Sequence, residues 1–373
     1  MRHSIGCAAT VALALALHLQ AGAAEPWLEQ QTLFRAGQRG YATYRIPALV
    51  VTTRGTVLAV CEGRKKTGSD WDDVDLALRR SSDGGRTWSE IQFIADDGDL
   101  TMGNPCPVVD QSTGTIWLPF CRGSAPGRGN AQILLMKSTD DGQSWSKPVN
   151  ISPSAMNPAW PFAGTGPGHG IQLASGRLLI PCWADSTPSC GEIQTSYCFY
   201  SDDHGASWKL GQPLTRNASD ECDVVELADG SIYLNARSRQ DKKQRAYAFS
   251  KDGGHSWSEV RHDASQPEPS CDGAVVRLTH AAGSQKDRVL VSCPANPNAR
   301  DHMTIRLSYD QCRTWPVAKV LDPGYSGYSD LAVTGDHTIL CLYETEGCRA
   351  ITLARFNLAW LTDGRDSVTG KSK

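Results

Sequence analysis

Short apolar runs that open on glycine or aspartate recur along the chain and predict β-strands. The six runs are Gly55–Val60, Gly114–Leu118, Gly176–Ile180, Gly230–Leu234, Asp287–Val291 and Asp336–Leu342. Each of the first five is followed by a second predicted strand: Asp75–Arg80, Gln132–Lys137, Ser196–Tyr200, Arg245–Phe249 and Thr304–Leu307. The sixth is followed by Ala350–Phe356. Long helical periodicity is missing, so the pattern predicts an all-β chain.

Each of the five second strands runs into a box of the form S-x-D-x-G-x-x-W. The boxes are Ser81–Trp88, Ser138–Trp145, Ser201–Trp208, Ser250–Trp257 and Ser308–Trp315, the last with Cys312 in place of glycine. Serine and aspartate side chains hydrogen-bond to the backbone of tight turns, glycine permits positive φ, and tryptophan packs under the hairpin. A calcium loop is the alternative, but each box offers only one or two carboxylates. We therefore interpret the box as a structural turn.

The repeat has a period of about 50 to 60 residues and consists of short strands, which is typical of a β-propeller. The count predicts six blades, each a four-stranded antiparallel sheet. The last unit ends after its third strand, so we expect an N-terminal strand near Gln31 to Arg35 to complete it and close the ring.

The chain has 373 residues, a formal net charge of -3 and 21% charged residues. Apart from Arg64-Lys65-Lys66 it has no basic run, which argues against nucleic-acid binding. Residues 1–24 contain an apolar run followed by small residues and are interpreted as a signal peptide. We expect a single β-propeller domain over 25–362 and a disordered tail over 363–373. No later stretch is apolar enough to span a bilayer, so a secreted protein is expected, extracellular or periplasmic.

Thirteen cysteines are present, and twelve of them follow the predicted signal peptide. Four recur near the same repeat position, which favours a packing role: Cys61, Cys121, Cys182 and Cys293. Cys190 and Cys198 flank a short connection and are the best candidates for a local disulfide. No Cys/His spacing indicates zinc, and neither a metal nor a cofactor is expected.

A run of four residues, Tyr44-Arg45-Ile46-Pro47, opens the first unit. With this R-I-P motif ahead of several Asp boxes, the chain from about Trp27 to Trp360 resembles the exo-α-sialidases. The resemblance implies release of terminal α-linked sialic acids from glycoproteins, glycolipids and oligosaccharides. It also implies retention of configuration through a tyrosyl-enzyme intermediate.

The resemblance implies three arginines that hold the substrate carboxylate, a task that suits the planar, permanently charged guanidinium. The first is Arg45. The second is implied on the strand before the fourth box, at Arg245, and the third before the fifth box, at Arg306. Arg237 competes with Arg245, because it ends its strand in an L-N-A-R run. Arg245 lies five residues before its box and Arg306 two, an odd difference that a bulge must absorb unless one assignment is wrong.

The same resemblance implies an acid, a nucleophile and a base. Asp70, in an acidic loop, has the best spacing from Arg45 and is the expected general acid. Tyr328 is the implied nucleophile, because a neutral phenol approaches an anomeric carbon that carries its own carboxylate more easily than an anion would. The phenol needs a base, and Glu226 is the candidate. Tyr325 is the nearest competitor of Tyr328.

Further residues are expected around the site. Glu62 and Arg64 could support the arginine cluster, and Gly168-His169-Gly170 indicates a turn more than a catalytic histidine. Four side chains are candidates for contact with an N-acetyl group: Trp117, Met136, Phe162 and Trp183.

Two other functions fit the pattern. A trans-sialidase would transfer the sugar to another glycan and would need an acceptor site that shields the intermediate from water. A non-catalytic propeller would only bind glycans or proteins, since Asp boxes also occur without enzymatic activity.

Overall fold

The structure is a computed structural model that describes residue 1 and residues 25–123, 131–185, 193–281 and 285–368. Most of the predicted signal peptide, residues 2–24, lies outside the described residues, and so does Cys190 of the predicted disulfide. No helix in the described ranges is long and apolar enough to cross a membrane.

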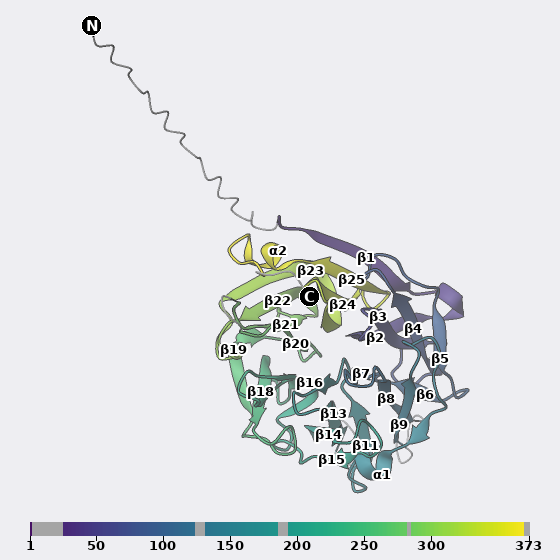
Figure 1. Cartoon of the computed structure of the whole chain (residues 1–373). Coiled ribbons are helices and arrows are strands. Elements are labelled where there is room, and N and C mark those ends of the chain that lie inside the picture. The colour runs from purple at the N-terminus through teal and green to yellow at the C-terminus, as the bar shows by residue number, and fades with distance from the viewer. Residues whose placement is uncertain (2–24, 124–130, 186–192, 282–284, 369–373) are drawn as a thin grey trace.

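The strands form four mostly antiparallel sheets arranged around a common centre (Figure 1). The first contains β2 (Thr43–Val51), β3 (Val57–Arg64), β4 (Val74–Ser81), β5 (Gln92–Ala95), β6 (Thr101–Gly103), β7 (Val108–Val109), β8 (Ile116–Gly123), β9 (Gln132–Ser138) and β10 (Val149–Asn150). The second contains β11 (Phe162–Thr165), β12 (Ile171–Gln172), β13 (Leu178–Asp185), β14 (Gln194–Ser201) and β15 (Lys209–Leu210). The third contains β16 (Ser219–Glu226), β17 (Ile232–Ser238), β18 (Gln244–Ser250) and β19 (Arg261–Pro267).

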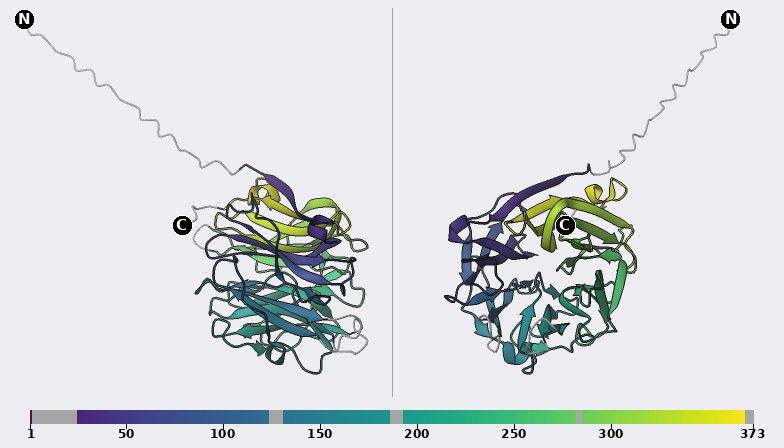
Figure 2. Two further views of the ribbon diagram at one scale, coloured as in Figure 1. Left: turned by 90° about the vertical axis from the view of Figure 1, so that its right-hand side faces the viewer. Right: turned by 180° about the vertical axis from the view of Figure 1, so that it is seen from behind.

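The fourth sheet joins the C-terminal strands to the N-terminal one. It contains β1 (Leu28–Arg35), β20 (Ala274–Thr279), β21 (Arg288–Pro294), β22 (Asp301–Ser308), β23 (Val317–Val333), β24 (Ile339–Thr345) and β25 (Ala350–Phe356). The helical segments are short: η1 (Gln38–Gly40), α1 (Ser152–Ala155) and α2 (Leu358–Thr362). The view from behind shows the same ring of sheets (Figure 2, right).

The all-β prediction is confirmed. The six apolar runs lie in β3, β8, β13, β17, β21 and β24, and the strands predicted after them are β4, β9, β14, β18, β22 and β25. Most of the strands begin one to three residues later than the apolar runs, because the opening glycine or aspartate belongs to the preceding turn. The arrangement of the sheets around a centre is that of a β-propeller.

β1 pairs antiparallel with β25, from Leu28 opposite Phe356 to Arg35 opposite Ala350. A segment near this position was expected to pair with the last unit, and it does. Phe34 is fully buried there, in one cluster with Leu353 of β25 and residues of β2 and β3. Burial of this apolar surface joins the two ends of the folded chain.

The boxes are turns held by their own side chains. In the first, the Gly85 amide donates to Ser81 Oγ (2.8 Å) and the Thr87 amide donates to Asp83 Oδ1 (2.9 Å). In the fifth, Cys312 takes the glycine-like φ of 62° and its amide still donates to Ser308 Oγ (3.0 Å). The serine and aspartate side chains therefore fix the turn, which agrees with a structural role for the box.

The ordered chain continues beyond residue 362, where the sequence predicted a disordered tail to begin. Asp366 accepts hydrogen bonds from Nε and Nη2 of Arg288, both at 2.8 Å, and Val368 packs against the neighbouring apolar cluster. Arg288 is buried, and the Asp366 carboxylate compensates its charge there. Asp366 and Val368, which the sequence assigned to the tail, thus contact the preceding domain.

The recurring cysteines are buried and free, which agrees with the packing interpretation: Cys61, Cys121, Cys182 and Cys293. Cys198 is also fully buried. Burial raises the pKa of the Cys61, Cys182 and Cys198 thiols well above the usual value, so these groups remain neutral.

Candidate active site

A buried tyrosine and a glutamate from two different strands are hydrogen-bonded to each other. The hydroxyl of Tyr328, on β23, donates to the Glu221 carboxylate on β16, with its oxygen 2.7 and 2.6 Å from Oε1 and Oε2. Burial and the Glu221 carboxylate raise the pKa of Tyr328 well above its usual value, against the opposing effect of Arg237 and Arg300. The phenol is therefore neutral and already bonded to a base.

Three guanidinium groups surround Tyr328. Nη1 of Arg237, at the end of β17, donates to the Tyr328 oxygen (3.0 Å) and to Glu221 Oε2 (2.9 Å). The guanidinium carbons of Arg45 and Arg300 lie 5.4 and 5.2 Å from the centre of the tyrosine ring. Three arginines around one phenol form a site for an anion, and a carboxylate matches the fork of a guanidinium.

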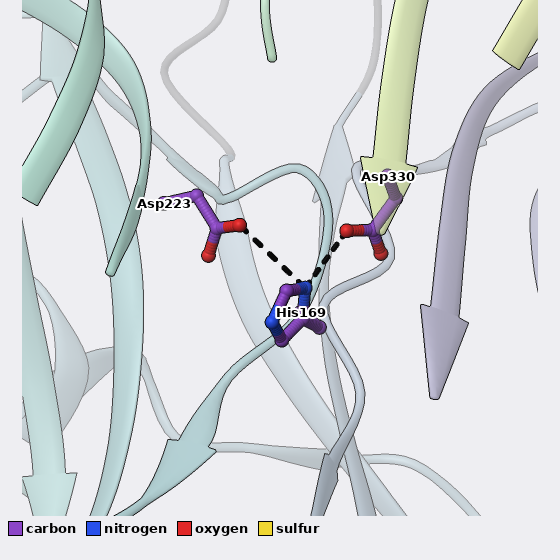
Figure 3. Close-up of side chains that lie close together, drawn as sticks. All are labelled: His169, Asp223 and Asp330. Carbon is purple, nitrogen blue, oxygen red and sulfur yellow. Dashed lines mark hydrogen bonds and ion pairs between the residues drawn. The ribbon is translucent and has the colours of Figure 1, made fainter. Parts of the chain in front are cut away.

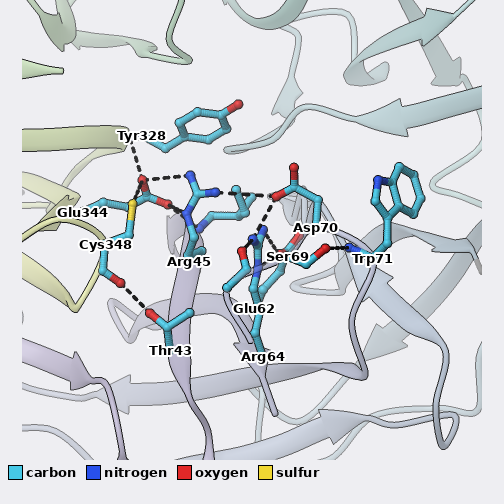
Figure 4. Close-up of polar contacts among 12 residues, drawn as sticks. Thr43, Arg45, Glu62, Arg64, Ser69, Asp70, Trp71, Tyr328, Glu344 and Cys348 are labelled. Atoms are coloured by element: carbon cyan, nitrogen blue, oxygen red, sulfur yellow. Dashed lines mark hydrogen bonds and ion pairs between the residues drawn. The ribbon is translucent and has the colours of Figure 1, made fainter. Parts of the chain in front are cut away.

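Arg45 is held in place by a glutamate and by an unusual backbone. Its Nε and Nη2 donate to the two carboxylate oxygens of Glu344, at 3.0 and 3.1 Å (Figure 4). Ile46 has a φ of 58°, which is strained for a β-branched residue, and the β2–β3 register shifts there. The Ile46 amide also donates to Glu344 Oε1 (3.0 Å). The R-I-P motif thus forms a bulge that directs Arg45 to Glu344.

Glu344 connects Arg45 to the tyrosine backbone. The Tyr328 amide donates to Glu344 Oε2 (3.2 Å), and a Cβ on the preceding Gly327 would lie 2.2 Å from the same oxygen. Burial opposes ionisation, but Arg45 and the two amides lower the pKa of Glu344 below its usual value. Gly327 is therefore required because no side chain fits beside this carboxylate.

Arg237 lies between two carboxylates. Besides Glu221, the buried Asp220 lies near it, with Oδ2 3.6 Å from Arg237 Nε and 3.2 Å from Arg239 Nη1. Burial raises the pKa of Asp220 to about 7, with Glu221 adding to the rise and Arg237 opposing it. Charged neighbours thus hold Arg237 against β16.

Asp70 reaches toward the same group of residues from the loop after β3. Its Oδ1 lies 2.8 Å from Arg64 Nη1 and 3.5 Å from Arg45 Nη1, and its side chain is 67% exposed (Figure 4). Arg64 is buried and donates through Nε and Nη2 to Glu62 Oε2 (2.9 and 2.7 Å). Asp70 is therefore an exposed carboxylate beside the site, and the buried pair of Glu62 and Arg64 holds it rather than the arginine cluster.

A cavity of ≈ 290 Å³ adjoins Tyr328, Glu221, Arg237 and Asp70. Away from these charges its wall includes three aromatic rings: Phe162 lies 5.6 Å from Trp71 and 5.0 Å from Trp183, between ring centres. Phe162 and Trp183 thus line the cavity as expected for a contact with an acyl group. The other two candidates do not: Trp117 packs against Trp208, and Met136 lies in the core.

Glu226 does not lie where the sequence predicted. Its Oε2 accepts the Ala174 amide (2.8 Å), and Glu221 occupies the place beside Tyr328. Both glutamates belong to β16, but Glu221 stands where the register with β17 shifts, whereas Glu226 pairs regularly with Ile232. The acidic start of β16, Asp220-Glu221, was the missed signal.

Arg245 and Arg306 are structural and do not reach Tyr328. Arg245 is fully buried and donates to Asn235 Oδ1 (2.6 Å) and the Cys271 carbonyl (2.7 Å), while Arg306 donates to the Ser265 carbonyl (3.2 Å). The competing candidate Arg237 and the unpredicted Arg300 lie beside Tyr328 instead. The sequence contained a signal: N-A-R occurs at Asn235-Ala236-Arg237 and again at Asn298-Ala299-Arg300.

The fold and the motifs define the class of the chain. Residues 55–341 match the BNR repeat-like domain family. A sialidase of Micromonospora viridifaciens is 37% identical over 95% of this chain and 58% of its own length, and sialidase-3 of Rattus norvegicus is 31% identical over 84% of this chain and 90% of its own. The chain belongs to the sialidase family.

A solved structure, the Hadza microbial sialidase Hz136, shares the fold. It superposes with a TM-score of 0.77 at 29% identity, over 87% of this chain and 67% of that one. The chain spans 58% and 61% of the length of two bacterial sialidases that it matches, from M. viridifaciens and Bacteroides fragilis.

Proposed function

We propose that this protein is a retaining exo-α-sialidase that hydrolyses terminal α-linked sialic acids of glycoproteins, glycolipids and oligosaccharides. The observation that carries the proposal is the Tyr328 hydroxyl bonded to Glu221 at 2.6 Å within a set of three arginines. A tyrosine–carboxylate pair supplies a nucleophile, and the arginines supply a site for the carboxylate of a sialic acid.

In the proposed mechanism, Arg45, Arg237 and Arg300 bind the substrate carboxylate and direct the anomeric carbon to Tyr328. The phenol oxygen attacks that carbon while Glu221 takes the phenolic proton. A neutral phenol suits this step, because a free carboxylate nucleophile would be repelled by the substrate carboxylate. The glycosidic bond breaks and leaves a tyrosyl glycoside.

Asp70 is the proposed acid and base of the reaction. It protonates the departing glycosidic oxygen, and it then takes a proton from the water that attacks the intermediate. The water displaces Tyr328, which recovers its proton from Glu221, so the released sugar keeps the α configuration. The exposed position of Asp70 beside the cavity allows contact with the leaving group and with water. The aromatic wall of Trp71, Phe162 and Trp183 suits the apolar part of an acyl group.

We also infer that the four sheets comprise six blades and that β1 closes the ring. The pairings support this: β23 is long enough to pair with β22 by its first half and with β24 by its second, and β6 of the first sheet bridges two further units. We further propose that residues 1–24 are a signal peptide and that the protein is exported.

The proposal is tested with purified protein and a fluorogenic sialoside. We expect release of sialic acid, with loss of most activity in Tyr328→Phe and little change in Tyr325→Phe, the neighbouring tyrosine that bonds to Cys348 instead. Proton NMR of the first product should show the α anomer. No release of sialic acid would refute the proposal, and transfer to added lactose as the main reaction would replace hydrolysis by trans-glycosylation.

A further inference from the structure

A buried ionic bridge crosses the centre of the ring near the tyrosine–glutamate pair. Nδ1 of His169 lies 2.7 Å from Asp330 Oδ1 and 3.6 Å from Asp223 Oδ2 (Figure 3). The side chains of the three residues are at most 9% exposed, so water screens their charges little. Burial lowers the pKa of His169, but the two carboxylates outweigh it and raise the pKa to about 9. Burial likewise raises the pKa of Asp223 to about 7, and His169 opposes that rise.

The loop that carries His169 has little freedom to move. The Gly170 amide donates to the Pro107 carbonyl (2.9 Å). A Cβ on Gly170 would lie 2.6 Å from Ile180 Cδ1 and 2.9 Å from the Leu179 carbonyl oxygen. Gly170 therefore serves close packing, and it holds the imidazole between the two carboxylates.

The bridge joins the same two strands that carry the proposed nucleophile and base. Asp330 stands two residues after Tyr328 on β23, and Asp223 stands two residues after Glu221 on β16. Glu221 and Tyr328 both stand where the strand register shifts, and regular pairing has resumed at Asp223 and Asp330. Each strand thus carries one member of the pair in an irregular stretch and one end of the bridge directly after it. Among the described strands, β16 pairs only with β17, and β23 only with β22 and β24. No hydrogen-bonded ladder sets the distance between β16 and β23.

The two carboxylates extend the connection to other strands of the centre. Asp330 Oδ2 accepts the amide of Leu49 (2.6 Å) on β2, the strand of Arg45, and Asp223 Oδ2 accepts the amide of Val275 (2.9 Å) on β20. Without the imidazole, the two buried carboxylates would lose the group that bonds to both of them, and the link between the strands would be lost.

We infer that His169 is a positioning residue: its imidazole, held between Asp223 and Asp330, keeps β16 and β23 at the separation that places Tyr328 against Glu221. The expected effect on kcat rests on the proposed sialidase activity. The expected effect on the distance between Tyr328 and Glu221 does not, because that distance can be measured in an inactive protein.

The test compares His169→Gln with His204→Gln. His204 makes the same kind of ion pair, with Nδ1 3.0 Å from Asp110 Oδ2, but its side chain is 53% exposed and lies away from Tyr328. We expect His169→Gln to lower kcat at least 10-fold and to change the Kd of a sialic acid analogue, 2,3-didehydro-2-deoxy-N-acetylneuraminic acid, less than threefold. Arg45 is held by Glu344 and not by the bridge, which explains the smaller effect expected on the Kd. The control should alter neither quantity.

A crystal structure of His169→Gln should show the Tyr328 oxygen beyond hydrogen-bond reach of Glu221, more than about 3.5 Å away. If this variant does not fold, the double variant His169→Gln/Asp223→Asn, which removes the excess negative charge, should fold and show the same separation. An unchanged distance, or a kcat within twofold of wild type, would overturn the inference. A stoichiometric metal ion bound to His169 in purified protein would also overturn it. A wild-type protein without activity would refute the proposed function and leave the distance as the deciding observation.

Discussion

Replacement of Gly327 by alanine should disable the site without a new group entering the cavity. The added Cβ would lie 2.2 Å from Glu344 Oε2, whereas ordinary contact begins at 3.4 Å. The carboxylate must therefore move by about 1.2 Å, a distance that lengthens its 3.0 and 3.1 Å bonds from Arg45 beyond hydrogen-bond range. Gly327 does not take a positive φ, so the backbone itself tolerates alanine.

A hydrogen bond to a charged group contributes about 1.5–3 kcal/mol, and every 1.4 kcal/mol is about tenfold in rate. Loss of one such contact in the transition state predicts that kcat/KM for a fluorogenic sialoside falls about 10- to 100-fold. Gly335→Ala is the matched control on the turn after β23, because its Cβ would meet no atom within 4 Å. Thermal unfolding verifies that both variants fold. If kcat/KM of Gly327→Ala stays within threefold of the Gly335→Ala value, Glu344 does not position Arg45 as described.

Three further outcomes follow from the geometry. Glu221→Gln should lower kcat by about 10²- to 10⁴-fold, the usual range for a lost general base, while Glu226→Gln should stay within about threefold of wild type; equal losses would contradict the assignment. Arg300→Ala should raise KM in steady-state kinetics, whereas Arg306→Ala should lower the melting temperature with little effect on the KM of the folded fraction. Burial alone would raise the pKa of Asp366, but its partner Arg288 lowers that pKa to about 2. The ionised Asp366 carboxylate therefore stabilises the fold above its unfolded-state pKa of about 4, and this stabilisation is lost as the pH falls toward 2. The melting temperature of Asp366→Asn should accordingly lie below that of wild type at pH 7 and approach it at pH 3.

The sequence predicted the fold well because the repeat encodes it locally. Each apolar run opens on a turn residue, and each second strand ends in a turn that its own serine and aspartate hold. These features need no knowledge of distant parts of the chain. Arg45 and Tyr328 were likewise recognisable, because each stands in a motif beside a residue with a special backbone requirement. Ile46, next to Arg45, forms a bulge, and Gly327, next to Tyr328, leaves no room for a side chain.

The remaining site residues depend on which end of a strand reaches the centre of the ring. Glu221 and Glu226 share one strand, and only the three-dimensional arrangement shows that the early one meets Tyr328. Arg245 stands near the correct end of β18 but is directed into the core toward backbone carbonyls. Arg300 lies in a loop, where neither strand periodicity nor the boxes give a position. Burial and direction of a side chain are long-range properties, and a single repeat unit does not encode them.

The central claim is that Tyr328 is the nucleophile, and covalent trapping tests it most directly. Incubation with 2,3-difluorosialic acid should add one sugar to the protein, and peptide mass spectrometry should place it on the peptide that contains Tyr328, on the tyrosine itself. Glu221→Gln should slow the labelling and Tyr328→Phe should abolish it. An adduct on any other residue would contradict the account. An active enzyme that forms no adduct and inverts the configuration of the sugar would also contradict it.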